Sequence, residues 1–187
     1  MIHRRAALAA AAAAALLGPA HAHGGVWQAL RAPGHLALIR HALAPGSHDP
    51  PGFRLGDCAT QRNLSDEGRA QARALGDAFR REGLIAAPVF SSQWCRCVET
   101  ARLLSLGEVV EEPLLNSFIA DRRRGEAQMT ALRARIAAMP AGPPPVFVTH
   151  QVVVTALTGI HPGSGELIVV ERRATELLVR GRVSVGG

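Results

Sequence analysis

Residues 35–41, His35-Leu36-Ala37-Leu38-Ile39-Arg40-His41, form a short apolar run that ends in an arginine and a histidine. A short, continuous apolar run is typical of a strand buried on both faces of a sheet. A second run, Val146-Phe147-Val148, continues in the same way into Thr149-His150. Ligands of open α/β sheets bind beyond the carboxyl ends of the strands. The two runs therefore predict two histidines at one rim of a sheet.

Helical patterns alternate with the strand patterns along the rest of the chain. Ser65 is a typical N-cap, and four residues at helical spacing form the apolar face of the helix that it starts: Ala72, Leu75, Gly76 and Phe79. Further strands are expected at 88–91 and 109–110, further helices after Ser92, at 126–139 and after His150, and an antiparallel pair at 167–170 and 176–179. This order predicts an α/β fold, a three-layer sandwich whose mostly parallel central sheet is flanked by helices. Residues 44–63 are rich in Pro, Gly, Ser and Asp and predict a loop of a length that is uncommon without a function.

Residues 1–22 have the pattern of a secretory (Sec-type) signal peptide. Arg4 and Arg5 precede the uncharged run Ala6–Leu17, and Ala20-His21-Ala22 supplies a cleavage site after Ala22. The run has 12 residues, whereas a helix that spans a membrane needs about 20. We therefore expect a periplasmic or secreted mature chain, residues 23–187, with a single domain and no stable membrane insertion after cleavage. No internal repeat or shift in composition marks a second domain.

The composition narrows the classes of partner. Of the 187 residues 48% are hydrophobic, which excludes a disordered chain, and only 4% are aromatic, with no Tyr. Few side chains can therefore stack on bases, and no nucleic-acid partner is expected. The formal charge of +6 becomes +4 when the two arginines of the signal peptide are removed. That charge favours an anionic small molecule without selecting one.

The expected export bears on the three cysteines, because disulfides persist in oxidising compartments. Cys95 and Cys97 are two residues apart on an expected helix and point in different directions, so they should not pair. If a disulfide forms, Cys58–Cys95 is the pair we expect, and Cys97 is then a thiol of the core. No CxxC or HxxxH spacing supports a zinc site.

The predicted rim gathers two histidines and two arginines. Arg40 and His41 end one strand, His150 ends another, and Arg96 lies early in the helix that follows a third. Guanidinium groups bind phosphate oxygens bidentately and stay charged at any working pH. Each residue taken alone has a structural explanation, but the four together favour a phosphoryl ligand.

Four motifs resemble the histidine phosphatase (phosphoglycerate mutase-like) superfamily, branch 1. They are Leu38-Ile39-Arg40-His41-Ala42, the helix Leu64–Ala72, the segment Ser91–Ala101 around Arg96, and Val146–His150. Their order and spacing agree over about residues 36–180 and imply the phosphoglycerate mutase-like fold. More loosely, the cysteine-bearing loop and the export signal are similar to the periplasmic lipopolysaccharide-core heptose-phosphate phosphatases.

The resemblance implies a role for each matching residue. His41 would be the nucleophile that forms a phosphohistidine, and Arg40, Arg96 and His150 would hold the phosphoryl oxygens of a small phosphorylated substrate. Neither a metal nor any other cofactor is implied. Nearby guanidiniums oppose protonation of His41, as attack on phosphorus requires.

The chain departs from the family pattern at several positions. Ala42 and Gln151 replace the glycines that usually follow the two histidines, and Gln151 is a candidate phosphate ligand. The usual place of the proton donor, 114–117, holds no carboxylate. Asp121 is the candidate that we favour over Glu126, and an exposed ion pair with the neighbouring arginines explains it equally well.

Residues of the long loop are further candidates for contact with the substrate. Asn63 is a candidate phosphate ligand or simply stops the loop with a local hydrogen bond. Arg62 and Arg54 are candidates for a second anionic group. His48 and Asp49 have no third metal ligand at a suitable spacing.

Three functions remain open at this point. The first is an exported, metal-independent phosphatase acting on a phosphomonoester or phosphoanhydride. The second is a non-catalytic phosphate-binding module of the same fold, or, less expected, a phosphotransferase or mutase. The third is a secreted metal-binding domain.

Overall fold

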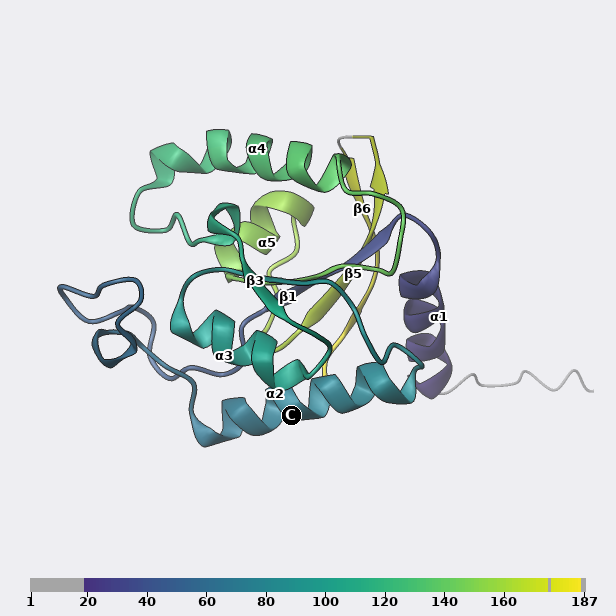
Figure 1. Ribbon diagram of the computed structural model, residues 1–187, viewed down its shortest axis with the longest axis horizontal. Coiled ribbons are helices and arrows are strands. Elements are labelled where there is room, and N and C mark those ends of the chain that lie inside the picture. The colour runs from purple at the N-terminus through teal and green to yellow at the C-terminus, as the bar shows by residue number, and fades with distance from the viewer. Residues whose placement is uncertain (1–18, 175, 186–187) are drawn as a thin grey trace, which may run out of the picture.

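The computed structural model describes residues 19–174 and 176–185. Their centre is a six-stranded sheet with the order β3-β2-β4-β1-β5-β6 (Figure 1). Its strands are β1 (His35–Arg40), β2 (Val89–Ser91), β3 (Val109–Glu111), β4 (Val146–Thr149), β5 (Leu167–Arg173) and β6 (Glu176–Val183). The pairings among β1 to β4 are parallel, and β5 pairs antiparallel with β1 and β6. The predicted α/β fold with a mostly parallel sheet is confirmed.

Helices cover both faces of the sheet, as Figure 1 shows. The helices are α1 (Pro19–Arg31), α2 (Asp66–Arg81), α3 (Cys95–Leu104), α4 (Gly125–Ala137) and α5 (Gln151–Thr158). One apolar core lies between the sheet and α1, α2 and α3, and a second lies between the opposite face and α4 and α5. Strands β1 and β4 are buried on both faces because they contribute alternate side chains to the two cores, which is why their sequences are continuous apolar runs.

The N-terminal part of the described chain contains a helix that the sequence analysis did not predict. Helix α1 was not expected; Trp27 and Leu30 bury its apolar side, and the Trp27 ring meets the ring of Phe79 on α2 at a centroid distance of 5.1 Å. The predicted signal peptide lies outside the described residues up to position 18, and α1 contains the expected cleavage point after Ala22. No helix in the described ranges combines the length and the apolar character that crossing a membrane requires.

Helix α2 begins where the sequence predicts. The Ser65 side chain accepts a hydrogen bond from the backbone N–H of Gly68 at 3.1 Å, as an N-cap does. The helix then packs its first turn against the backbone that follows His41. A Cβ atom on Gly68 would lie 2.0 Å from the carbonyl oxygen of Leu43. This position therefore admits no side chain while the two segments keep their distance.

We expect Gly68→Ala to lower the free energy of unfolding by about 2–3 kcal/mol, the range of an overpacked core. The contact partner is backbone, which cannot rotate away as a side chain can. Urea unfolding followed by circular dichroism measures the effect. Gly142→Ala is the matched control, because a Cβ at Gly142 would meet nothing within 4 Å. A Gly68→Ala protein as stable as the control contradicts this account of the α2 contact.

Candidate active site

Two histidines lie side by side because β1 and β4 are parallel neighbours in register. Arg40 pairs with Thr149, and the His41 backbone N–H donates to the Thr149 carbonyl at 2.9 Å. The imidazole rings of His41 and His150 therefore come together, with centroids 5.6 Å apart and planes inclined by 70°. Both side chains are buried. The shared strand rim that the sequence predicted is present.

A cavity of about 480 Å³ opens at this rim, and we call it the rim cavity. Its lining comes from the ends of β1 and β4, from α3 and α5, and from the loops between them. The lining residues are Arg40, His41, Ser47, Arg62, Arg96, Ser117, Phe118, Ile119, Arg122, His150, Gln151, Val152, Thr155, Ala156 and His161. Five predicted site residues thus meet in one place: Arg40, His41, Arg96, His150 and Gln151.

The guanidinium of Arg96 is held by a carboxylate that the sequence did not single out for this role. Nη1 and Nη2 of Arg96 donate to Oδ1 and Oδ2 of Asp49 at 2.7 and 3.2 Å. The Trp94 indole N–H donates to the same carboxylate at 3.0 Å, and so does the backbone N–H of Arg62. Burial alone would raise the pKa of Asp49, but these hydrogen bonds lower it below its ordinary value. Asp49 is thus an anion that fixes the orientation of Arg96.

Three arginine nitrogens have no partner. The Nε–H groups of Arg40, Arg62 and Arg96 are buried and donate to no acceptor among the described residues. One terminal nitrogen of Arg40 and one of Arg62 are anchored: Arg40 Nη1 donates to the Pro162 carbonyl at 3.0 Å, and Arg62 Nη1 donates to the carbonyls of Ala44 and Gly46. Buried polar groups are nearly always hydrogen-bonded. Three cationic side chains that each keep an unpaired donor line one cavity, and this arrangement fits an oxyanion with several oxygens.

The tautomer of His41 follows from its single hydrogen bond. Nδ1 lies 2.8 Å from the carbonyl oxygen of Ala42, and a carbonyl only accepts, so Nδ1 carries the proton. The lone pair is then on Nε2, the nitrogen available to a substrate. Burial, and then the charges of Arg96, Arg40 and Arg62, lower the pKa of His41 to about 3 against the opposing effect of the Ala42 carbonyl. His41 is therefore a neutral nucleophile at ordinary pH.

Two small side chains contact the imidazole of His150. Its Nε2 lies 2.8 Å from Ser92 Oγ and 3.5 Å from Cys97 Sγ. The helix predicted after Ser92 is α3, which begins at Cys95 with Trp94 at the N-cap, and the Ser92 hydroxyl contacts His150. Burial comes first, followed by the repulsion that a second proton on the His41–His150 pair would meet and by the charges of the nearby arginines; together they lower the pKa of His150 well below its ordinary value. Both histidines are thus kept uncharged.

Two buried neutral histidines make stability depend on pH. The pKa of His41 is about 3 in the native protein against an ordinary 6.5, so only the unfolded chain gains a proton between these values. Stability is full above pH 6.5 and is lost as the pH falls through this range. Between pH 6 and 5 we expect each histidine to lower the free energy of unfolding by up to about 1.4 kcal/mol. Urea unfolding at the two pH values measures this slope. The His41→Gln variant should show about half of it, and an unchanged slope would contradict the assignment.

The long loop is fastened close to Arg96 by a disulfide. Cys58 and Cys95 are bonded, as the sequence led us to expect, and Cys97 is free and buried. The Cys95 backbone N–H also donates to Oε1 of Gln61 at 3.0 Å. Since Arg96 follows Cys95 directly, the disulfide ties the loop that carries Asp49 to the helix that carries Arg96.

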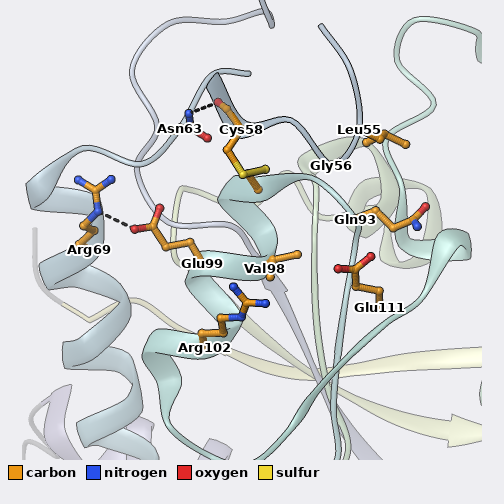
Figure 2. A pocket seen from close by; sticks show the side chains of 11 residues that line it. Leu55, Gly56, Cys58, Asn63, Arg69, Gln93, Val98, Glu99, Arg102 and Glu111 are labelled. Carbon is orange, nitrogen blue, oxygen red and sulfur yellow. Dashed lines mark hydrogen bonds and ion pairs between the residues drawn. A yellow bond between two sulfur atoms is a disulfide. The ribbon is translucent and has the colours of Figure 1, made fainter. Parts of the chain in front are cut away.

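Some candidate residues do not reach the rim cavity. Asn63 donates to the Cys58 carbonyl at 2.7 Å and lines a different cavity, of about 660 Å³, beside the disulfide (Figure 2). Its alternative role, closing the loop locally, is the one that the structure shows. Asp121 accepts from Arg123 Nε at 3.1 Å and is not among the residues that line the rim cavity.

The remaining candidates also have other partners. Arg54 pairs with Asp57, and Asp49 pairs with Arg96 rather than with His48. Within the described ranges, no three His, Cys, Asp or Glu side chains are grouped in a way that could hold a metal ion.

Comparison with known proteins agrees with this architecture. Residues 36–118 match the model of the histidine phosphatase superfamily (branch 1). SixA from Agrobacterium tumefaciens superposes with a TM-score of 0.59 at 20% sequence identity, covering 83% of this chain and all (100%) of that one. The fold is that of the histidine phosphatases.

Two further structures with the histidine phosphatase fold were solved with oxyanions. The protein histidine phosphatase SixA complexed with tungstate has a TM-score of 0.55 at 14% identity, over 80% of this chain and 96% of its own. A mycobacterial glucosyl-3-phosphoglycerate phosphatase complexed with VO3 has a TM-score of 0.55 at 16% identity, over 78% and 96%. A search of curated protein sequences found no match to this chain.

Proposed function

We propose that this chain is an exported, metal-independent phosphatase of the histidine phosphatase superfamily. It hydrolyses a small phosphomonoester or a phosphoanhydride through a phosphohistidine on His41. The observation that carries this proposal is the rim cavity itself. A neutral His41 and the side chains of Arg40, Arg62 and Arg96 line this one space, and the Nε atoms of these arginines are buried without a partner. The phosphatases of the same fold, among them one that acts on glucosyl-3-phosphoglycerate, support it.

The proposed reaction has two steps. Nε2 of His41 attacks phosphorus while the bond from phosphorus to the leaving group breaks, and water then cleaves the N–P bond to give inorganic phosphate. The arginines and His150 hold the phosphoryl oxygens in both steps. Most of the rate enhancement comes from positioning and from fixed positive charge, as in other phosphoryl transfers.

A non-catalytic phosphate-binding module is the second candidate. The observation in its favour is that no carboxylate lines the rim cavity to protonate a leaving group. Such a protein would bind inorganic phosphate and hydrolyse nothing.

Hydrolysis of p-nitrophenyl phosphate in excess EDTA separates these functions. We expect turnover at the same rate with and without EDTA. Binding of inorganic phosphate without turnover would instead establish the binding module, and loss of turnover in EDTA would establish a metal enzyme.

Two features support the proposal that the protein is exported. The segment 1–22 has the sequence pattern of a signal peptide, and a disulfide such as Cys58–Cys95 persists in oxidising compartments such as the periplasm. N-terminal sequencing of the protein from a periplasmic fraction tests this, and we expect it to begin at His23. A cytosolic protein that retains residues 1–22 would contradict it.

A further inference from the structure

The proposed reaction lacks a proton donor. An alkoxide is a poor leaving group, and general acid catalysis typically contributes a factor of about 10²–10⁴. None of the residues that line the rim cavity is Asp or Glu. Asp49, the carboxylate bonded to Arg96, is an anion because three donors lower its pKa, so it has no proton to give. The donor must therefore be sought among other side chains of the cavity.

Among the titratable side chains that line the rim cavity, one is left as a candidate for the proton donor. The arginines do not deprotonate in proteins. His41 is the nucleophile, and His150 is buried, uncharged and held by Ser92. His161 is the remaining imidazole, and it both lines the cavity and is exposed to solvent.

The segment that carries His161 is anchored to the catalytic strand. The carbonyl of Pro162 accepts from Arg40 Nη1 at 3.0 Å, and the Gly165 backbone N–H donates to the carbonyls of Arg40 and His41, each at 3.1 Å. The buried carboxylate of Glu166 accepts from the Gly163 backbone N–H at 2.7 Å. These bonds keep the backbone from Pro162 to Glu166 at a fixed place beside the end of β1.

A second contact reaches the ring itself. Nε2 of Gln151 lies 3.5 Å from Nδ1 of His161; with the amide turned so that Oε1 faces the ring, Gln151 would accept from the Nδ1–H of an imidazolium. Because Gln151 directly follows His150, this contact links His161 to the end of β4. The same contact gives Gln151 a role that differs from the phosphate ligand expected from the sequence.

We propose that His161 is the general acid for the leaving group, an inference that rests on the proposed function. As the Nε2–P bond of His41 forms and the P–O bond breaks, the His161 imidazolium gives its proton to the departing oxygen, and an alcohol leaves. Neutral His161 then takes a proton from the water that attacks phosphohistidine. The N–P bond breaks, inorganic phosphate leaves, and the imidazolium of His161 is restored.

The test uses substrates whose leaving groups differ in their need for a proton. In the full-length protein we expect His161→Gln to lower kcat/KM for glycerol 2-phosphate at least about 100-fold. For p-nitrophenyl phosphate, whose phenolate departs unaided, the same variant should stay within about threefold of wild type. Gln keeps a hydrogen-bonding group at the mouth of the cavity but cannot act as an acid. His48→Gln, in an exposed loop position outside the lining, is the matched control and should leave both substrates unchanged.

Each other outcome overturns the proposal. An equal loss on both substrates assigns His161 to binding or structure, and no loss on either removes it from the reaction. A selective loss on glycerol 2-phosphate in Asp121→Asn or His48→Gln, rather than in His161→Gln, identifies that residue as the acid. If wild-type protein hydrolyses neither substrate, the proposed function fails as well, so the two failures are distinguishable.

Discussion

We expect replacement of His41 with Ala to lower kcat/KM for p-nitrophenyl phosphate by at least about 10⁴-fold, corresponding to ~5.4 kcal/mol of transition-state stabilisation. The variant lacks Nε2, the only unprotonated nitrogen that the structure offers at the end of β1. It keeps the arginines and therefore the ability to bind the substrate. Removal of the nucleophile in other covalent enzymes leaves only the residual catalysis of binding and charge.

Two further measurements show whether the loss of activity in His41→Ala comes from the missing nucleophile rather than from misfolding or weaker binding. Inorganic phosphate should still raise the Tm of His41→Ala, which shows that the rim cavity is folded and binds an anion. The KM for p-nitrophenyl phosphate should change much less than kcat. Activity within tenfold of wild type would contradict a covalent mechanism at His41.

The second large effect is expected from Arg96→Lys, which we expect to lower kcat/KM at least about 100-fold. The planar guanidinium of Arg96 donates two hydrogen bonds to Asp49 and keeps a third nitrogen, Nε, unpaired and buried. An ammonium group cannot reproduce this fork and also reach the phosphate. Asp49 would moreover be left as an imperfectly paired, largely buried charge, which is costly.

Arg102→Lys on the same helix is the matched control. Arg102 is exposed and does not line the rim cavity, so the same change of side chain should leave kcat/KM unaltered. For Arg96→Lys, a kcat/KM within about twofold of wild type, or ~0.4 kcal/mol, would show that the fork is dispensable.

The positions of the two histidines and of Arg96 could be predicted from the sequence, because each follows the end of a strand or begins the helix after one. Buried parallel strands are continuous apolar runs, and the polar residue that follows each run must lie at the rim. The runs before His41 and His150 therefore located both histidines, and the helix after β2 located Arg96. The same patterns placed α2, whose cap and apolar face depend on short-range spacing alone.

Other residues depend on tertiary contacts that a sequence pattern does not encode. Asp49 lies in a long loop, and its place is set by how residues 44–63 fold back onto Arg96 and how Cys58 is bonded to Cys95. Helix α1 has two glycines and begins within the expected signal peptide, and it is stabilised by burial of Trp27 against Phe79 rather than by its own pattern. His161 comes to the rim cavity only because the backbone around Pro162 and Gly165 docks on β1.

Identification of a phosphoenzyme tests the central claim most directly. The full-length protein is mixed with ³²P-labelled substrate, quenched in alkali to preserve phosphohistidine, and digested for mass spectrometry. The account predicts an acid-labile phosphoryl group on Nε2 of His41, formed at a rate at least equal to turnover and missing from His41→Ala. Rapid turnover with no labelled enzyme, or with the label on another side chain, would contradict it.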